Sequence, residues 1–259
     1  MRKKIVLYTL LLSLTISCKD DGPDSPPYIE FQDITFIDAQ PSPSNPDPAD
    51  TLKVSFYFRD DDFDLGLDPS ELNAPFNRRF YFSKSDGAPV PDTKFQHGEV
   101  DREDLINYEF KRTHLPDTLP VFATPYNCRN WEVYRDLSTN KFVDTLYFQQ
   151  NRSFYNVYAT ILIVNPYAST SIYDFSEKFI YPNCQLNGFN GRFHYPRAPV
   201  PGSPFTIHMT SLREGIFTYA MRSVGWKIFF AGQKIKVRVA IQDRALHLSN
   251  EIETSEVQF

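Results

Sequence analysis

The stretch that decides the fold runs from Thr51 to Glu71 and reads TLKVSFYFRDDDFDLGLDPSE. In its first half, apolar residues alternate with polar or amphipathic ones, so that one face collects Leu52, Val54, Phe56 and Phe58. Strict alternation over this length predicts a β-strand with one buried face. The strand runs directly into a cluster of carboxylates, which is the most unusual chemistry in the chain.

A second strand with the same pattern is expected near the C-terminus, at Lys234 to Gln242. Its inward positions are Ile235, Val237, Val239 and Ile241. Asp60 comes two residues after inward Phe58, and Asp243 comes two residues after inward Ile241. If the two strands point the same way in a sandwich, both acids emerge at the same end.

The composition favours strands and long loops over helices. The chain contains 20 prolines, 23 phenylalanines and 15 tyrosines, and helical periodicity is hard to find. Further strands are expected at 28–37, with a bulge near Asp33, at 78–83, at 154–164, where both faces are apolar, and at 215–223, 226–230 and 253–259, with one or two more within 118–150. We therefore predict an all-β fold, an immunoglobulin-like antiparallel sandwich over residues 28–259. A long irregular insertion at about 84–150 is expected to embellish this single domain.

The N-terminus reads as a lipoprotein signal peptide over residues 1–17. Three basic residues precede an apolar run of about a dozen residues, which is too short to span a bilayer as a helix. The run ends at Ile16-Ser17-Cys18, a lipobox pattern that makes Cys18 the acylated N-terminus, anchored to a membrane by its lipid. An ordinary secretory signal or an uncleaved anchor are the alternatives. Residues 18–27 are expected to form a disordered tether.

Charge and cysteine content narrow the possible partners and the compartment. Removal of the three basic residues with the signal peptide changes the formal net charge from −5 to −8, and no basic run stands out, so nucleic acid is a poor partner. Cys128 and Cys184 then remain in an oxidising compartment, where a disulfide between them is the first expectation. Two buried free thiols are the alternative.

Three segments resemble surface lipoproteins of unknown function from Bacteroidetes-type bacteria. They are the lipobox with its following Cys18-Lys19-Asp20-Asp21, the strand and acidic turn Phe56 to Leu67, and the terminal segment Ile241 to Asn250. The resemblance implies an outer-membrane protein that faces the cell exterior, and a β-fold, but no activity. Similar proteins often carry glycine at the position of Phe63, so the turn in this chain is expected to be bulkier.

The acidic turn has the spacing of a calcium loop. Counted from Asp60, carboxylates fall at the first, third, fifth, ninth and twelfth positions, and Ca²⁺ takes six to eight oxygen ligands from such alternating residues. An EF-hand is excluded, because Leu65 occupies the sixth position, where that loop requires glycine, and because a strand precedes the turn. The candidate ligands are Asp60, Asp62, Asp64, Asp68, Glu71, Asp243 and Asn250, with Ser249 as a further oxygen donor. A solvated turn, or one paired with Arg78, Arg79 or Arg244, is the competing interpretation.

The chain lacks the common sequence signatures of catalysis. It contains no Gly-x-Ser-x-Gly elbow, no His-Glu-x-x-His and no phosphate loop, and its five histidines are scattered, with His247 lying in the Asp243 loop. We therefore expect a non-catalytic module, with a hydrolase as a remote alternative. Binding of glycan or of an envelope protein through exposed aromatics, with Tyr57, Tyr158, Trp131 and Trp226 as candidates, is one hypothesis. An accessory role in a surface complex is another.

Overall fold

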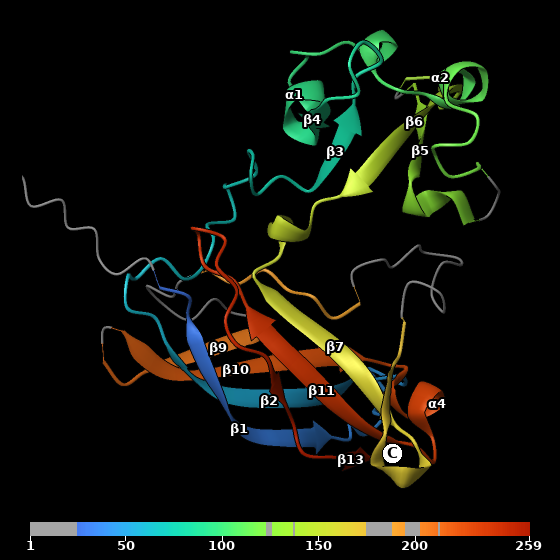
Figure 1. Ribbon diagram of the computed structural model, residues 1–259. Coiled ribbons are helices and arrows are strands. Elements are labelled where there is room, and N and C mark those ends of the chain that lie inside the picture. The colour runs from blue at the N-terminus through green and yellow to red at the C-terminus, as the bar shows by residue number, and fades with distance from the viewer. Residues whose placement is uncertain (1–24, 123–125, 137, 175–187, 195–202, 212) are drawn as a thin grey trace, which may run out of the picture.

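The computed structural model describes residues 25–122, 126–136, 138–174, 188–194, 203–211 and 213–259. Two antiparallel sheets pack face to face as a β-sandwich, and a third sheet lies beyond one end of it (Figure 1). The predicted all-β sandwich is therefore confirmed. Cys18 and the predicted signal peptide lie outside the described residues.

The first sheet is organised around the strand that the alternating sequence predicts. β2 pairs with β1 on one side and with β10 on the other, and β9 forms the far edge. The register of β1 shifts between Phe31 and Asp33, where the sequence suggested a bulge. The strands are β1 (Tyr28–Ile37), β2 (Asp50–Arg59), β9 (Phe205–Met209) and β10 (Glu214–Ser223).

The second sheet has the other alternating strand at its centre. β11 pairs with β7 along its whole length, while β8 adds to β7, and the two short strands β12 and β13 both add to β11. The expected final strand is thus divided into two. The strands are β7 (Val157–Val164), β8 (Thr170–Ile172), β11 (Lys234–Ile241), β12 (Ile252–Glu253) and β13 (Val257–Gln258).

The main core lies between these two sheets. The inward residues of β2 and of β11 belong to one cluster, in which Phe56 stacks on Phe217 at 4.9 Å between ring centroids. Leu65, which follows the acidic turn, belongs to the same cluster and is 3% exposed. The end of β2 is therefore anchored to the core on both sides of the carboxylates, and this fixes where they lie.

The sequence suggested an irregular insertion, but the structure forms a four-stranded antiparallel sheet here. Its strand order is β4-β3-β6-β5, and two small apolar clusters of its own cover the sheet. The strand expected at 78–83 is β3, and β5 and β6 lie within 118–150, where one or two strands were expected without bounds. Their bounds escaped prediction because β6 is buried on both faces at its centre and does not alternate. The elements are β3 (Arg79–Phe82), β4 (Pro89–Pro91), β5 (Trp131–Arg135), β6 (Phe142–Gln150), α1 (Asp92–Gln96) and α2 (Tyr108–His114).

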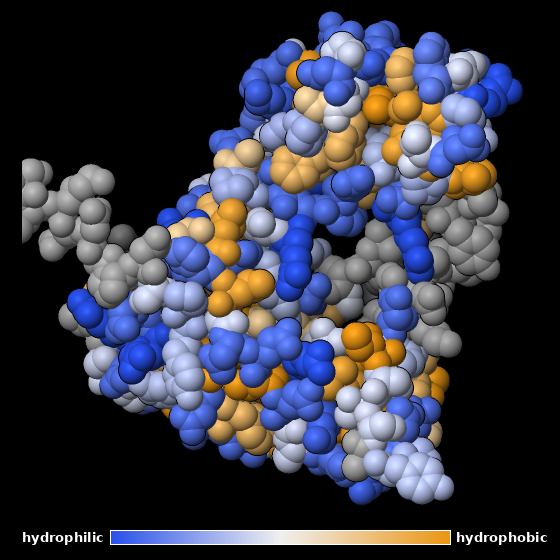
Figure 2. All heavy atoms as spheres, viewed as in Figure 1, coloured by the Kyte–Doolittle hydropathy of each residue, from blue (hydrophilic) through white to orange (hydrophobic). Residues whose placement is uncertain are grey.

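The segment Trp226–Phe230, expected as a strand, is instead the short helix α4. Its two ends, Trp226 and Phe230, are each 1% exposed, because residues four apart share one helical face. Among the described residues, no helix is long and apolar enough to cross a membrane. The space-filling view shows hydrophilic side chains over most of the visible face and apolar side chains in small groups (Figure 2).

Cys128 is disulfide-bonded, as expected for a cysteine in an oxidising compartment. It lies in the short 3₁₀ helix Tyr126–Arg129, immediately before β5 of the insertion. The predicted partner, Cys184, lies outside the described residues. The pairing of these two cysteines therefore stays a prediction.

Candidate metal site

The acidic turn curls tightly where β2 ends. The Asp60 amide donates to the Arg213 carbonyl at 2.8 Å, which continues the pairing with the β9–β10 hairpin by one residue. Phe63 and Gly66 then adopt φ angles of 64° and 88°, so the chain bends twice within a few residues. This bending places the Asp60, Asp62 and Asp64 side chains around one point, with carboxylate oxygens within 4.8 Å of one another.

Each of these three carboxylates keeps one buried oxygen without a hydrogen bond. Oδ1 of Asp60, Oδ1 of Asp62 and Oδ1 of Asp64 are inaccessible and accept no bond. The second oxygens are better satisfied: Asp60 Oδ2 accepts from the Leu65 amide at 3.2 Å, and Asp64 Oδ2 accepts from the Ala245 amide at 2.9 Å. Buried polar atoms in native proteins almost always have a partner, so three unpaired oxygens at one point call for an explanation.

The segment after β11 completes the cluster, as the phase of the two strands suggested. Leu65 and Asp243 form an isolated antiparallel bridge, which joins the two loops directly. Asp243 is 1% exposed, and both of its oxygens contact His247: Oδ1 accepts the backbone amide at 2.7 Å, and Oδ2 lies 3.0 Å from Nδ1. Asp62, Asp243 and His247 also place one ligand atom each within 4.8 Å of one another. Asp62 therefore belongs to both groups.

Burial and mutual repulsion make these acids hard to ionise. Burial first, and then the hydrogen bond and charge of Asp62, raise the pKa of Asp60 from 3.8 to about 7. Burial, followed by the charges of Asp243 and Asp62, raises the pKa of Asp64 to about 6. Burial also raises the pKa of Asp243, against the opposing effect of His247. At neutral pH the corner must therefore hold protons, carry repelling charges or take up a cation.

Arginine does not neutralise the cluster. Among the described residues, no arginine or lysine forms an ion pair with Asp60, Asp62 or Asp64. Arg244 instead donates to the Gly66 carbonyl at 2.8 Å and to Glu71 at 2.9 Å. Arg79 pairs with Glu132 in the insertion, and the Arg78 guanidinium lies over the Phe154 ring. The arginine pairing that was the alternative to a metal therefore involves Arg244 and Glu71 and leaves the three clustered carboxylates without an arginine partner in the described part of the chain.

The remaining predicted ligands are engaged elsewhere. Asp68 is exposed and accepts from the Ser70 amide at 2.8 Å, while Glu71 pairs with Arg244. Asn250 binds the backbone of Ile29 twice, accepting from its amide at 2.9 Å and donating to its carbonyl at 2.8 Å. The Ser249 hydroxyl donates to the Asn250 carbonyl and accepts from the Ile241 amide. The structure brings together Asp60, Asp62, Asp64 and Asp243, but not these residues.

His247 is the residue at this corner that sequence reasoning did not include among the ligands. Its place in the Asp243 loop was visible, but its contact with Asp243 depends on the turn that follows β11, where Leu246 has a φ angle of 71°. A histidine bonded to a ligating carboxylate orients that carboxylate. The donors themselves are mostly carboxylate oxygens, which suit a hard cation such as Ca²⁺.

The aromatic residues proposed for ligand binding do not form an exposed strip. Trp131 is 2% exposed and Trp226 is 1% exposed. Tyr158, expected to face outward, is buried at 8%, and its hydroxyl donates to Gln242 at 2.7 Å. Tyr57 does lie on the outer face, where it is half buried and donates to Glu214. These four side chains therefore give no support to stacking on a sugar ring.

Comparison of the chain with protein-family models, with curated proteins and with solved structures gives no match.

Proposed function

We propose that this protein is a lipid-anchored cell-envelope protein, attached to the outer membrane through Cys18 and facing the cell exterior. Its sandwich acts as a non-catalytic binding or accessory module, and Ca²⁺ bound at the corner of Asp60, Asp62, Asp64 and Asp243 stabilises it. The proposed location in the cell envelope rests on the signal-peptide and lipobox pattern of the sequence. The calcium site rests on the geometry of the corner.

One observation carries the calcium proposal: three buried carboxylate oxygens converge without a hydrogen-bond donor. Asp60 is only 3% exposed, so water does not solvate its free oxygen. Desolvating a charged oxygen is costly, and a cation that several oxygens share offsets that cost for all of them at once. Bound Ca²⁺ would also link the end of β2 to the loop after β11, that is, one sheet of the sandwich to the other.

A calcium titration followed by thermal unfolding tests this proposal. A ligand that binds only the folded state stabilises it by about 2.7 kcal/mol at 100 times its dissociation constant. For a domain of this size we expect a rise in Tm of roughly 5–10 °C. EDTA should reverse the rise, and the same concentration of Mg²⁺ should give a smaller one, because Mg²⁺ loses its water reluctantly.

The Asp62→Asn variant is the matched test, because it keeps the size of the side chain and removes the charge of a residue whose buried Oδ1 accepts no hydrogen bond. This variant should lose most of the calcium response. A wild-type Tm that does not move at millimolar calcium would remove the metal from the proposal. Acylation is tested separately, since Cys18→Ala should abolish lipid labelling in cells without changing the calcium response of the purified protein.

A further inference from the structure

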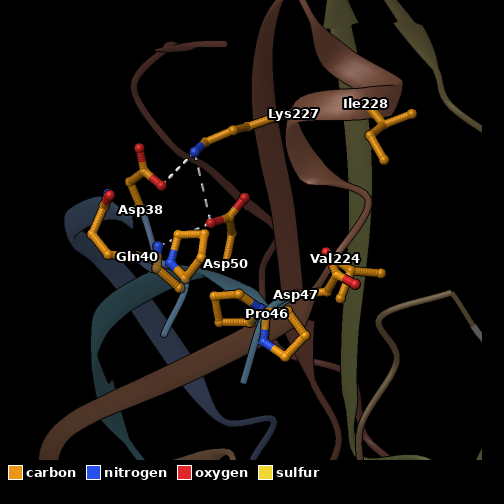
Figure 3. A pocket seen from close by; sticks show the side chains of 11 residues that line it. Asp38, Gln40, Pro46, Asp47, Asp50, Val224, Lys227 and Ile228 are labelled. Atoms are coloured by element: carbon orange, nitrogen blue, oxygen red, sulfur yellow. Dashed lines mark hydrogen bonds and ion pairs between the residues drawn. The ribbon is translucent and has the colours of Figure 1, made fainter. Parts of the chain in front are cut away.

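A cavity of about 460 Å³ opens at the end of the sandwich opposite the acidic corner. β2 begins at Asp50, beside this cavity, and ends at Arg59, beside the corner, so the full length of the strand separates the two. The cavity lies between the loop that joins β1 to β2 and the helix α4 (Figure 3). Its size is that of a pocket for a small ligand or for one or two side chains.

The charged groups in this cavity are mainly acidic. Asp38, Asp47 and Asp50 line it, and Lys227 is the only basic residue among its lining residues. Figure 3 shows the Lys227 amine directed at the Asp38 and Asp50 carboxylates. The amine forms an ion pair with Asp38 and lies 4.0 Å from Oδ1 of Asp50. The ammonium group of Lys227 therefore lies near two of the three acids.

Asp47 is the acid of this cavity that remains for a ligand, because Asp50 is already held by Lys227 and by the Ala39 amide. Asp50 is 6% exposed and is held by the Ala39 amide, which donates to Oδ1 at 2.9 Å; within the described part of the chain its Oδ2 accepts no hydrogen bond. Asp47 is exposed and, among the described residues, pairs with no cation. Three acids and a single lysine line the cavity, and this acidic surplus is one that a second cation would match.

An apolar shelf adjoins these carboxylates. Val224 is 61% exposed and Ile228 is 75% exposed, and both line the cavity. Ile228 lies on the outer side of α4, because Trp226 and Phe230 occupy its buried face. Exposed aliphatic side chains in a cavity with an acidic surplus suit a ligand that carries a positive charge beside an apolar group.

We propose that this cavity binds a basic segment of a partner protein, with a lysine or arginine side chain on Asp47 and a neighbouring apolar side chain on Val224 and Ile228. Charge complementarity selects the basic residue, and the shelf selects its apolar neighbour. The site is independent of calcium, since it lies at the far end of β2 from the acidic corner.

Fluorescence anisotropy with short labelled peptides tests the inference on the full protein. One peptide alternates leucine with lysine, and the matched peptide carries glutamate in place of lysine. We expect the lysine peptide to bind, the glutamate peptide not to bind, and binding to weaken as salt is added. Spermidine, a cation without an apolar group, should compete only weakly, because it makes no use of the shelf.

Variants of exposed residues locate the site without disturbing the fold. Asp47→Asn should weaken binding about two- to fivefold, as expected for an exposed ion pair. Ile228→Ser should weaken it about tenfold through the loss of apolar contact. The matched controls are Asp101→Asn and Val121→Ser, which alter exposed residues of the insertion and should change neither binding nor Tm.

Three results would each overturn the inference. The first is equal binding, or no binding, of the two peptides. The second is an affinity that neither Asp47→Asn nor Ile228→Ser changes, since the peptide then sits elsewhere. The third is competition by spermidine as strong as that of the lysine peptide, because the cavity would then take small polyamines and not a protein segment.

Discussion

Phe63 occupies a backbone conformation that side chains of its kind rarely adopt. Its φ angle is 64°, its ring is 45% exposed, and the Arg213 guanidinium lies 4.7 Å from the ring centroid. Glycine adopts this left-handed conformation without the strain that a side chain adds, so the position favours glycine. The ring is partly exposed and lies beside Arg213, so Phe63 contributes to the bend of the backbone and not to the set of metal ligands.

Substitutions at Phe63 should therefore be graded by their tolerance of a positive φ angle. Phe63→Val should lower the free energy of unfolding by about 1–2 kcal/mol, because a β-branched residue is strained there. Phe63→Gly should change it by less than about 1 kcal/mol, since relief of strain offsets the lost ring contact and the greater freedom of glycine in the unfolded chain. Urea unfolding measures both. Equal destabilisation by the two would show that the ring, and not the backbone, matters.

The raised pKa of Asp60 predicts how the calcium-free protein responds to pH. Its carboxyl has a pKa of about 7 in the folded state and an ordinary value of 3.8, so between these values the folded state binds more protons than the unfolded state. The free energy of unfolding that Asp60 contributes is then largest below about pH 4 and falls as the pH rises toward 7.

Asp60→Asn isolates this contribution from those of the other carboxylates. The stability of the wild type relative to the variant, measured by urea unfolding in EDTA, should decrease steadily from pH 4 to pH 7.5. A relative stability that stays constant, or increases, over this range would mean that Asp60 ionises as freely in the folded protein as in the unfolded one.

At the scale of elements, Asn250 ties the first strand to the last segment of the chain. Its amide makes two hydrogen bonds to the backbone of Ile29, which is fully buried at the start of β1. Asn250→Asp would leave the Ile29 carbonyl without its donor, and we expect a loss of about 1–3 kcal/mol in the free energy of unfolding. The calcium response should persist, because Asn250 lies outside the cluster. A lost response with unchanged stability would restore the predicted ligand role.

Strand prediction succeeded at β2 and β11, where alternation marks one buried face, and at β7, where a continuous apolar run marks a central strand, but it was incomplete at β6 and wrong at α4. β2 and β11 border the main core on one face only, so their sequences alternate and their bounds were close to those observed. β6 is buried on both faces, and α4 is too short and too apolar for its sequence to distinguish a helix from a strand. The buried pair Trp226 and Phe230, four residues apart, was the available signal for the helix.

Part of the candidate site could be predicted because β2 and β11 alternate clearly enough to show which residues face the core. The matching phases of β2 and β11 indicated that Asp60 and Asp243 would meet, because both strands leave the core at one end. The sequence did not indicate that Asn250 would bond the backbone of Ile29, and it offered Arg244 as a partner of the turn without indicating that Glu71 would be the acid it bonds. Such partners depend on how loops pack, and the spacing of residues along the chain does not encode that.

At the scale of the whole molecule, the acidic corner joins parts that are far apart in the sequence. The turn after β2, the loop after β11 and the β9–β10 hairpin meet there through the Leu65–Asp243 bridge and the Asp60–Arg213 hydrogen bond. The chain also leaves this region toward the insertion, whose sheet begins at Arg79. Repulsion between buried carboxylates opposes this junction, and under the calcium proposal a bound cation would make the same groups hold it together.

Urea unfolding of the wild type and of Asp62→Asn, in EDTA and again in saturating calcium, tests this account most directly. In EDTA the variant should be at least as stable as the wild type, because it carries one fewer repelling charge in the cluster. In calcium the variant should be less stable by about 2–3 kcal/mol, because it binds the ion poorly. The account predicts this reversal of sign. The same difference in stability between the two proteins in both solutions would contradict it.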